Sequence, residues 1–381
     1  MPKVDIGIVG WGSVSPLGSS REEVMQAYQD GKPLFTKDDE GTWVGALSRS
    51  DQELLHSLRQ SSRLYRALDQ TTLMAMYASQ QAVTSCLSAN ETAFGVNIGA
   101  SRGATGEWEQ HYDTFRDSPS ELSPLASPST TLGNIASWTA HHLGSSGVVL
   151  EHSITCSTGL QAFANATVWL ESGRYQRFLA GGAEAPLTPF TVAQMQALRV
   201  YSKEAGDFPC QSLHLAKAKN TMILAEGAAS FCLERNPKNA IAYIRGIGYG
   251  REVLASATSI KSNGACIQVA MQQALAEAEL DTVDVVIAHA PGTIKGDRAE
   301  LNAIKTVFDL DRIAITSNKW QLGHALGASG SLSIEMALLM LQNQAFFPNP
   351  WMKSTPKGPV RTILVNAVGF GGQAISILLS A

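Results

Sequence analysis

The sequence predicts an α/β fold made of two similar halves packed together. Its 381 residues are 44% hydrophobic and 16% charged, and 33 of them are glycine. This composition is typical of buried strands joined by tight turns. Strand-like and helix-like apolar patterns alternate, and after Arg235–Pro237 the segment Ile241–Gly250 repeats the apolar strand and glycine-rich run of the N-terminus. We therefore expect one half in residues 1–236 and the other in residues 237–381.

The first half begins with an apolar segment, residues 4–10, which we expect to form a strand that ends in a Gly/Ser/Pro turn. Ser20 and Glu23 have the spacing of a capping box, so they predict a helix over Arg21–Gln29. The aperiodic residues 117–128 and 201–216 are expected to be surface excursions. The other predicted elements of this half are helices over 64–86, 134–143 and 159–171 and strands over 94–99, 148–154 and 178–181.

The second half shows the same alternation of strands and helices. Because this alternation is the pattern of layered α/β folds, it predicts one fold class for both halves. The predicted strands cover 241–250, 283–288, 313–318, 362–366 and 374–379, and the predicted helices cover 265–280, 298–308 and 329–344.

Charge and cysteine usage exclude several classes of protein. The net charge is −4 and no run of Lys or Arg is long, so we expect no nucleic-acid partner. The five cysteines include no CxxC pair, which argues against a disulfide framework or a zinc site and for a reducing compartment. The N-terminus lacks an apolar signal region and no apolar run could span a bilayer. We expect a cytoplasmic protein that does not enter a membrane.

Cys156 is the candidate nucleophile. It follows a strand-like run and precedes the predicted start of a helix, where the helix dipole and free N–H groups favour the reactive thiolate. Gly159 would permit a strained turn or the close approach of a substrate. Most buried cysteines are inert packing residues, an interpretation that we keep for the three that lie in apolar periodic runs, Cys86, Cys232 and Cys266.

Two histidines lie in glycine-rich settings. His289 ends an apolar strand and enters a Pro/Gly loop, and His324 is surrounded by small residues. Two neutral imidazoles can donate hydrogen bonds to one carbonyl oxygen and stabilise the negative charge that develops there. Zinc would need at least three converging ligands, so we expect no metal. A Cys–His pair could also serve a hydrolase, which usually combines one histidine with an orienting Asn or Asp.

In this order the motifs resemble the β-ketoacyl-acyl-carrier-protein synthases, or ketosynthases, the condensing enzymes of the thiolase fold. The resemblance runs nearly from end to end of the chain. It implies α-β-α-β-α layers, with the cysteine in the first half and the histidines and a Phe loop in the second. The motifs are Gly10-Trp11-Gly12 with Ser15–Gly18, Pro128–Thr130 and the run into Cys156, Glu226–Ala228, His289–Asp297, Lys319–Gly330 and Gly369–Gly372.

The resemblance implies an acyltransferase that condenses malonyl-acyl-carrier-protein, with loss of CO2, with an acyl chain held on Cys156. His289 and His324 would hold the malonyl thioester carbonyl and stabilise the enolate, and Lys319 would organise the pocket. The N–H groups of Cys156 and Phe370 would form the oxyanion hole, with Phe370 also acting as a gate. No cofactor is expected, since the phosphopantetheine arm comes with the carrier protein. The implied substrate-binding residues are Thr293, Gly369 and Gly371.

The chain departs from the family pattern in three places. The family's His-Gly-Thr-Gly-Thr is His289–Thr293 here, so Pro291 replaces a hydroxyl that contacts pantetheine. Its Arg-Asp-Gly-Phe appears as Lys219–Met222, and Ser333 stands where an acidic residue would pair with the lysine, with Glu335 two residues further on. These departures indicate a divergent type II branch, in fatty-acid-like, polyketide or aryl-polyene biosynthesis.

The expected partners are an acyl carrier protein and a second ketosynthase-like subunit, in a homodimer or a heterodimer. Arg63 and Arg66 precede an apolar helix. We favour the interpretation that they are the solvated end of this helix. The alternative is that they form a basic patch that steers an acidic carrier protein. The alternative function is a chain-length-factor-like partner subunit with little condensing activity. Such subunits typically lose the cysteine that this chain keeps. A thiolase or hydrolase is disfavoured by the paired histidine motifs.

Overall fold

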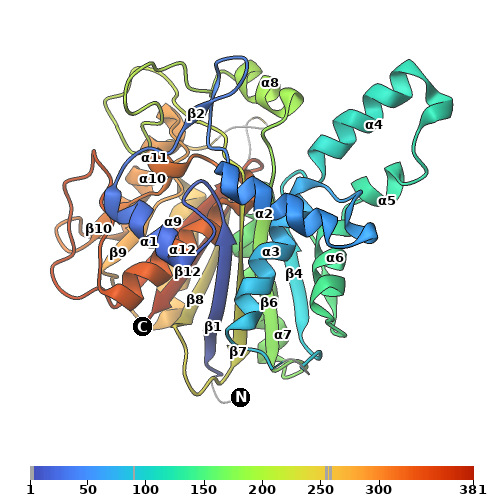
Figure 1. Ribbon diagram of the computed structural model, residues 1–381. Coiled ribbons are helices and arrows are strands. Elements are labelled where there is room, and N and C mark those ends of the chain that lie inside the picture. Colours follow the sequence, from blue (N-terminus) through green and yellow to red (C-terminus); the bar gives the residue numbers. More distant parts are fainter. Residues whose placement is uncertain (1–3, 89–90, 254–255, 257–259) are drawn as a thin grey trace.

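The strands form one large mixed sheet and a small two-stranded one. A computed structural model describes residues 4–88, 91–253, 256 and 260–381. The large sheet has ten strands in the order β10-β9-β11-β12-β8-β1-β7-β6-β4-β5 (Figure 1). The strands are β1 (Ile6–Val14), β2 (Thr36–Lys37), β3 (Trp43–Val44), β4 (Gly95–Gly99), β5 (Val149–Leu150), β6 (Arg177–Glu184), β7 (Gly227–Arg235), β8 (Ala242–Arg251), β9 (Val285–Ile287), β10 (Ala314–Thr316), β11 (Thr362–Gly369) and β12 (Gln373–Ser380).

The large sheet consists of two halves with the same topology. In the first, β4 pairs in parallel with β5 and β6, and β7 pairs antiparallel with β6 and β1. In the second, β9 pairs in parallel with β10 and β11, and β12 pairs antiparallel with β11 and β8. The halves meet where β1 pairs antiparallel with β8. This confirms the prediction of two similar α/β halves, although the exact boundary at residue 236 stays a prediction.

The helices are arranged around this sheet (Figure 1). None of the helices in the described residues is long and apolar enough to cross a membrane. The helices are α1 (Arg21–Asp30), α2 (Arg49–Gln60), α3 (Gln70–Thr84), α4 (Thr105–Asp117), α5 (Ala126–Thr130), α6 (Asn134–Leu143), α7 (Thr158–Glu171), α8 (Pro189–Ala197), α9 (Ala265–Ala278), α10 (Ile294–Val307), α11 (Lys319–Leu322) and α12 (Ser329–Asn343), with 3-10 turns η1 (Arg63–Tyr65), η2 (Pro119–Glu121) and η3 (Leu326–Ala328).

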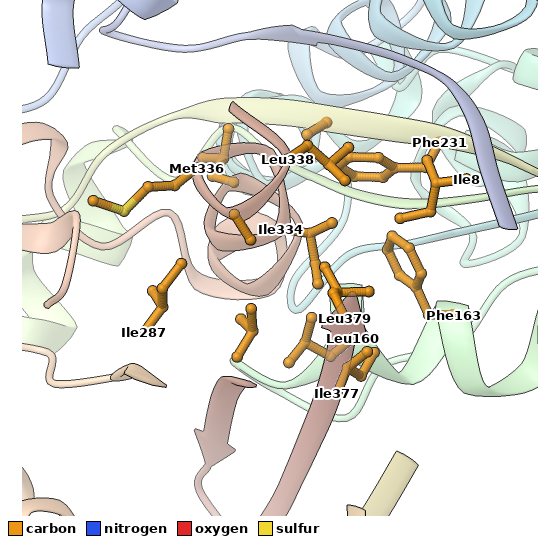
Figure 2. Close-up of a cluster of buried hydrophobic side chains, with 14 of the residues drawn as sticks. Ile8, Leu160, Phe163, Phe231, Ile287, Ile334, Met336, Leu338, Ile377 and Leu379 are labelled. Carbon is orange, nitrogen blue, oxygen red and sulfur yellow. The ribbon is translucent and has the colours of Figure 1, made fainter. Parts of the chain in front are cut away.

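The layers are those expected of a thiolase-like fold. Helices α7 and α12 pack against each other between the two sheet halves, and every residue of α12 from Ser329 to Leu341 is buried. Outside them, α3 and α6 cover the first half of the sheet, and α9 covers the second. The central core joins apolar residues of both halves (Figure 2). Burial at about 25 cal/mol per Å² of apolar surface is the main favourable contribution to the stability of such a core.

Several predicted bounds are correct to within one residue. The predicted helix over 134–143 is α6, and the capping box at Ser20 and Glu23 starts α1. The Ser20 hydroxyl accepts a hydrogen bond from the N–H of Glu23, whose carboxylate accepts one from the N–H of Ser20. The expected helix of residues 159–171 is α7, which begins one residue earlier.

The prediction that the first strand ends at Gly10 is wrong. Strand β1 continues to Val14 through Gly10 and Gly12. A Cβ atom at Gly10 would lie 2.3 Å from the carbonyl oxygen of Ala82, and one at Gly12 would lie 2.3 Å from the Cβ of Gln81. Both glycines are therefore present because α3 packs directly on the strand, and not because the chain turns there.

Other predictions were wrong in extent. The helix predicted over 64–86 is η1 followed by α3, because Asp69 caps a new helix by accepting a hydrogen bond from the N–H of Thr71. The strand predicted over 148–154 is only β5. Residues 201–216 are only partly a surface excursion, since residues 205–208 are exposed whereas Cys210, Ser212 and Leu213 are buried. Elements with no corresponding prediction include α2, α4, α8 and β7.

Candidate active site

Cys156 lies at a strained turn that leads into α7. The preceding residue, Thr155, has φ 51°, which is unfavourable for a β-branched side chain. Such strain is tolerated where the surrounding structure holds the backbone, and it is commonly found at functional sites. The Cys156 side chain is 8% exposed and packs in an apolar cluster with Val192 and Met195 of α8.

The structure brings both predicted histidines to Cys156. His289 follows β9 and His324 follows α11, and their ring centroids are 5.1 Å apart at an interplanar angle of 82°. Nδ1 of His324 lies 2.7 Å from the Ser329 hydroxyl, whereas Nδ1 of His289 has no hydrogen-bond partner among the described residues. If Ser329 donates to Nδ1, the proton of His324 is on Nε2. The three side chains line one cavity of about 580 Å³.

Burial keeps both imidazoles neutral at physiological pH. It lowers the pKa of His324 to about 3, and the charge of Lys319 acts in the same direction. The pKa of His289 is also lowered, first by burial and then by His324 and Lys319. A neutral imidazole has one N–H and can donate it without carrying a charge of its own. The pair is therefore suited to stabilise an oxyanion.

The Cys156 thiol does not have the lowered pKa that the helix terminus suggested. Burial raises its pKa to about 12, and the Glu184 carboxylate acts in the same direction. The charges of Lys319 and Arg102 oppose this increase but do not overcome it. Desolvation of a thiolate in an apolar cluster therefore outweighs the field of the helix N-terminus, whose effect is typically 0.3–1 kcal/mol, about 2 at most. At neutral pH the free thiol predominates.

The Phe370 loop completes one wall of the cavity. Gly369 is in contact with the nucleophile turn, since a Cβ at Gly369 would lie 1.8 Å from Oγ1 of Thr155 and 3.2 Å from the backbone nitrogen of Cys156. Phe370 lines the cavity and is 46% exposed. Gly371 has φ 93° and is not among the lining residues.

Thr293 and Pro291 also line the cavity. The Thr293 hydroxyl caps α10 by accepting a hydrogen bond from the N–H of Gly296 at 3.2 Å. Ala290, where the family has glycine, has φ 27°. Its strained backbone is held by Glu300, whose carboxylate accepts hydrogen bonds from the N–H groups of His289 and Ala290 at 2.8 and 2.7 Å.

Two buried carboxylates at the site were not predicted. Glu300 fixes the His289 loop, as described above. Glu184, at the end of β6, accepts hydrogen bonds from the N–H groups of Ser101, Arg102 and Gly327. It thereby joins the loop after β4 to the turn that follows His324. Burial raises the pKa of Glu184 to about 7. Glu184 is a single acidic residue within an apolar stretch, a pattern that could have singled it out, whereas Glu300 lies in a charged segment and gives no such signal.

The segment Lys219–Met222 contacts the His289 loop in spite of its unusual sequence. The Asn220 side chain accepts a hydrogen bond from the N–H of Ile294 at 2.9 Å, and Thr221 donates from its backbone and its hydroxyl to the carbonyl of Gly292. Close by, a buried ion pair joins Lys217 to Asp297 at 2.6 Å. These contacts anchor residues 217–222 against the His289 loop and the start of α10.

Among the described residues, Lys319 forms no ion pair with Glu335, the acidic residue that follows two positions after Ser333. Lys319 is buried, and its Nζ lies 3.4 Å from Oδ1 of Asn318, which also accepts a hydrogen bond from the Ser333 hydroxyl. No ion pair of the described residues includes Lys319. Burial lowers the pKa of Lys319 to about 8. Neither carboxylate oxygen of Glu335 has a hydrogen-bond partner among the described residues.

Replacing Glu335 with glutamine is expected to stabilise the protein only at higher pH. Burial raises the pKa of Glu335 to about 7, above its ordinary value of 4.5, although the nearby Ser13 hydroxyl, which does not form a regular hydrogen bond with the carboxylate, acts in the opposite direction. The unfolded chain therefore loses this proton first, and the penalty grows as the pH rises from about 4.5 to 7. Above pH 7 it is constant, on the order of 3 kcal/mol. Glutamine carries no charge and removes the penalty.

Urea denaturation of wild type and Glu335→Gln at pH 5 and pH 8 would measure this difference. We expect a higher free energy of unfolding for the variant at pH 8 and a much smaller difference at pH 5. Glu22→Gln is the matched control, since Glu22 is exposed on α1. An equal difference at both pH values would show that the carboxyl is not titrating in the folded core.

Arg63 and Arg66 are exposed at the turn η1, ahead of α3. Neither takes part in an ion pair of the described residues. The structure thus places both side chains in solvent, just before α3, and neither of them lines the cavity of Cys156.

Comparison with known proteins gives consistent matches. The family model described as "Beta-ketoacyl synthase, N-terminal domain" matches residues 3–239, and "Beta-ketoacyl synthase, C-terminal domain" matches residues 241–352. The chain is 26% identical to "3-oxoacyl-[acyl-carrier-protein] synthase 2" of Coxiella burnetii, covering 100% of this chain and 99% of that protein. It is 28% identical to the tetracenomycin polyketide synthase ketoacyl synthase alpha subunit of Streptomyces glaucescens, covering 77% and 72%.

Solved structures share the fold. The type II polyketide ketosynthase complex AntDE:AntF, with its acyl-carrier protein and a bound hexaketide, matches with a TM-score of 0.87 at 22% identity and covers 99% of each chain. The ishigamide ketosynthase/chain length factor matches with a TM-score of 0.87 at 18% identity and covers 100% of this chain and 99% of that one.

Proposed function

Because the chain belongs to the β-ketoacyl synthase family, we propose that it is a ketosynthase that condenses malonyl-acyl-carrier-protein with an acyl chain held on Cys156. The observation that carries the proposal is the convergence of Cys156, His289 and His324 on one cavity of about 580 Å³. One thiol and two neutral imidazoles can carry out acyl transfer and then stabilise an enolate. A cysteine hydrolase also forms an acyl-enzyme, but it would not need the second imidazole.

The first step transfers the acyl chain. The Cys156 sulfur attacks the thioester carbonyl of the acyl carrier, a C–S bond to Cys156 forms, and the bond to the phosphopantetheine sulfur breaks. The thiol of the carrier leaves with the proton that Cys156 loses. N–H groups of Cys156 and Phe370 stabilise the tetrahedral oxyanion, a role supported by the contact between Gly369 and the Cys156 backbone. The phosphopantetheine arm is part of the carrier substrate.

The second step makes the carbon–carbon bond. Malonyl-carrier loses CO2, and the electron pair of the broken bond becomes an enolate whose oxygen accepts hydrogen bonds from His289 and His324. The enolate carbon attacks the Cys156 thioester, the C–S bond breaks and the thiol is restored after protonation. Lys319 organises the pocket through its charge, and Thr293, Gly369 and Gly371 shape the approach of the pantetheine arm. The arm crosses Pro291 without the usual hydroxyl at that position.

A chain-length-factor-like subunit is the second candidate function. The observations that favour it are the strained Ala290, the raised pKa of Cys156 and the absence of an ion pair at Lys319 among the described residues. In that case the chain would shape the tunnel of a ketosynthase partner in a heterodimer. Retention of Cys156 in a cavity with both histidines favours the catalytic function.

The remaining parts of the proposal concern partners and context. An acyl carrier protein is the substrate-bearing partner, and the exposed Arg63 and Arg66 are a candidate contact for its acidic surface. The second subunit is either another copy or a ketosynthase-like homologue. We assign the protein to the cytoplasm and to a fatty-acid-like, polyketide or aryl-polyene system.

Intact-mass measurement tests this function directly. Incubation with an acyl-carrier thioester is expected to increase the mass of the protein by one acyl group, and malonyl-carrier should then remove it as a 3-oxoacyl-carrier. No mass gain alone, but turnover when a homologous partner subunit is added, would support the chain-length-factor hypothesis. No mass gain and no turnover in either case would contradict both candidate functions.

A further inference from the structure

Two cysteines outside the candidate active site lie close together, where the end of α3 packs on the sheet. Cys86 follows the last turn of α3, and Cys232 lies in β7. Both are free thiols, and Cys232 is buried whereas Cys86 is only half-buried. Neither lines the cavity of Cys156. The proposed function therefore makes no use of this pair.

The pairing of β1 with β7 brings the two side chains to one face of the sheet. Gly10 of β1 lies directly opposite Cys232. Residues opposite each other in an antiparallel pair point to the same face, with Cβ atoms about 4.5–5.5 Å apart. A Cβ atom at Gly10 would lie 3.1 Å from Sγ of Cys86. The Cys86 sulfur therefore occupies the space of a side chain at position 10, beside the side chain of Cys232.

Helix α3 packs closely on this face of the sheet. The hydroxyls of Ser79 on α3 and Ser230 on β7 are hydrogen-bonded at 2.9 Å. Because side chains two residues apart in a strand share a face, Cys232 faces α3 as Ser230 does. The missing side chain at Gly10 permits the close approach. A disulfide needs Cα atoms no more than about 7 Å apart, so this tight packing is a condition for joining the two cysteines.

The surroundings of Cys86 favour its thiolate. The Cys232 thiol is the largest cause of a lowered pKa at Cys86, and the charge of Arg177 adds to it, although burial acts in the opposite direction. Arg177 is held in place by ion pairs with Glu91 and Glu234, whose charges oppose its effect. The pKa of Cys232 is raised, first by Cys86 and then by burial. A thiolate is the form that peroxides oxidise, so Cys86 should react first.

We propose that Cys86 and Cys232 are a redox-sensitive pair that forms a reversible disulfide in the presence of hydrogen peroxide. The Cys86 sulfur attacks one peroxide oxygen, an S–O bond forms, the O–O bond breaks, and the released hydroxide takes up the thiol proton to give water. The Cys232 sulfur then attacks the Cys86 sulfenic acid. An S–S bond forms, the S–O bond breaks, and the second hydroxide leaves as water with the Cys232 proton. Two electrons pass from the thiols to the peroxide, and a dithiol reductant reverses the reaction.

The disulfide would stabilise the first half of the chain. It would close a long loop that runs from the end of α3 to β7. A cross-link over a long loop restricts the unfolded chain more than the folded one. Because neither sulfur lines the cavity of Cys156, the cross-link should leave the cavity unchanged. The oxidised protein is therefore expected to unfold several degrees above the reduced protein.

Peptide mapping after peroxide treatment tests the proposal. The full chain is treated with hydrogen peroxide, its remaining thiols are capped with iodoacetamide, and it is digested without reduction. We expect a linked peptide that contains Cys86 and Cys232 and disappears on treatment with dithiothreitol. In Cys232→Ala the link should be lost and Cys86 should gain oxygen atoms instead. Cys266→Ala is the matched control, since Cys266 is buried on α9 and should not affect the link.

A second variant and a thermal measurement make the test independent of one substitution. In Cys86→Ala, at the half-buried position, the link should be lost and Cys232 should remain a thiol. The thermal midpoint should increase on oxidation in the wild type and in Cys266→Ala, and in neither of the other variants. A wild type whose Cys86 gains oxygen without a link would overturn the proposal. Failure of Cys86 to react while a free cysteine peptide is fully oxidised would also overturn it. Acylation of Cys156 in the reduced protein is measured separately and tests only the proposed function.

Discussion

Replacing Cys156 with alanine is expected to abolish condensation. Without the sulfur no acyl-enzyme can form, so the product 3-oxoacyl-carrier should fall by about 10⁴-fold or more. Intact-mass spectra should show no acyl group on the variant, whereas the wild type gains one. Because the side chain is buried and alanine is smaller, the substitution leaves a small cavity and should not unfold the protein.

Cys266→Ala is the matched control for this variant. Cys266 is also buried, on α9, but packs in a different apolar cluster from Cys156 and does not line the cavity of the two histidines. It should retain wild-type acylation. Because burial raises the pKa of Cys156 to about 12, the acylation rate of the wild type should also increase from pH 7 to pH 9, as more thiolate forms. Acylation of Cys156→Ala at another residue would refute the assignment of the nucleophile.

Replacing either His289 or His324 with alanine is expected to slow malonyl decarboxylation by about 10²–10³-fold. Each imidazole would donate one of the two hydrogen bonds to the enolate oxygen, and neither contributes the sulfur that takes up the acyl chain. Acylation of Cys156 should therefore remain within a few fold of the wild-type rate. The measurements are CO2 release from malonyl-carrier by the acylated protein and the intact mass before malonyl-carrier is added.

His56→Ala serves as the control, since His56 is exposed on α2. Because burial lowers the pKa of His324 to about 3, decarboxylation by the wild type should not decline through protonation of this residue between pH 8 and pH 5. If both alanine variants lose acylation and decarboxylation to the same degree, the division of roles between Cys156 and the imidazoles is wrong.

The sequence alone was sufficient to predict those helices in which the buried residues recur with the period of the helix. The α1 capping box and the amphipathic α6 could be recognised from sequence because their start signals and apolar positions agree. Helix α4 could not be, since none of its residues is buried and it has no apolar face against the core. The glycines from Gly10 onward predicted a turn, but they are needed because α3 packs against the strand at this point. Only the tertiary structure shows this contact.

The candidate site shows the same limit. The residues Cys156, His289 and His324 could be selected from their motifs, and the structure places them around one cavity. Their protonation could not be predicted, because it depends on how completely the surrounding elements exclude water. The helix terminus suggested a lowered thiol pKa, whereas burial raises it. The surroundings of Lys319 could not be predicted either, since among the described residues the side-chain hydrogen-bond partner of its Nζ is Asn318 and the Glu335 carboxylate on α12 forms no hydrogen bond.

The antiparallel pairing of β1 with β8 has a consequence for the origin of the molecule. Each is the first strand of its half, and Ile6 faces Ile244 while Ile8 faces Ala242. Two identical subunits related by a two-fold axis would meet in this way, strand against equivalent strand and α7 against its counterpart α12. The chain is thus built like a homodimer whose subunits became covalently joined. The two halves differ in the side chains that they place at the cavity, since one carries the thiol and the other the imidazoles.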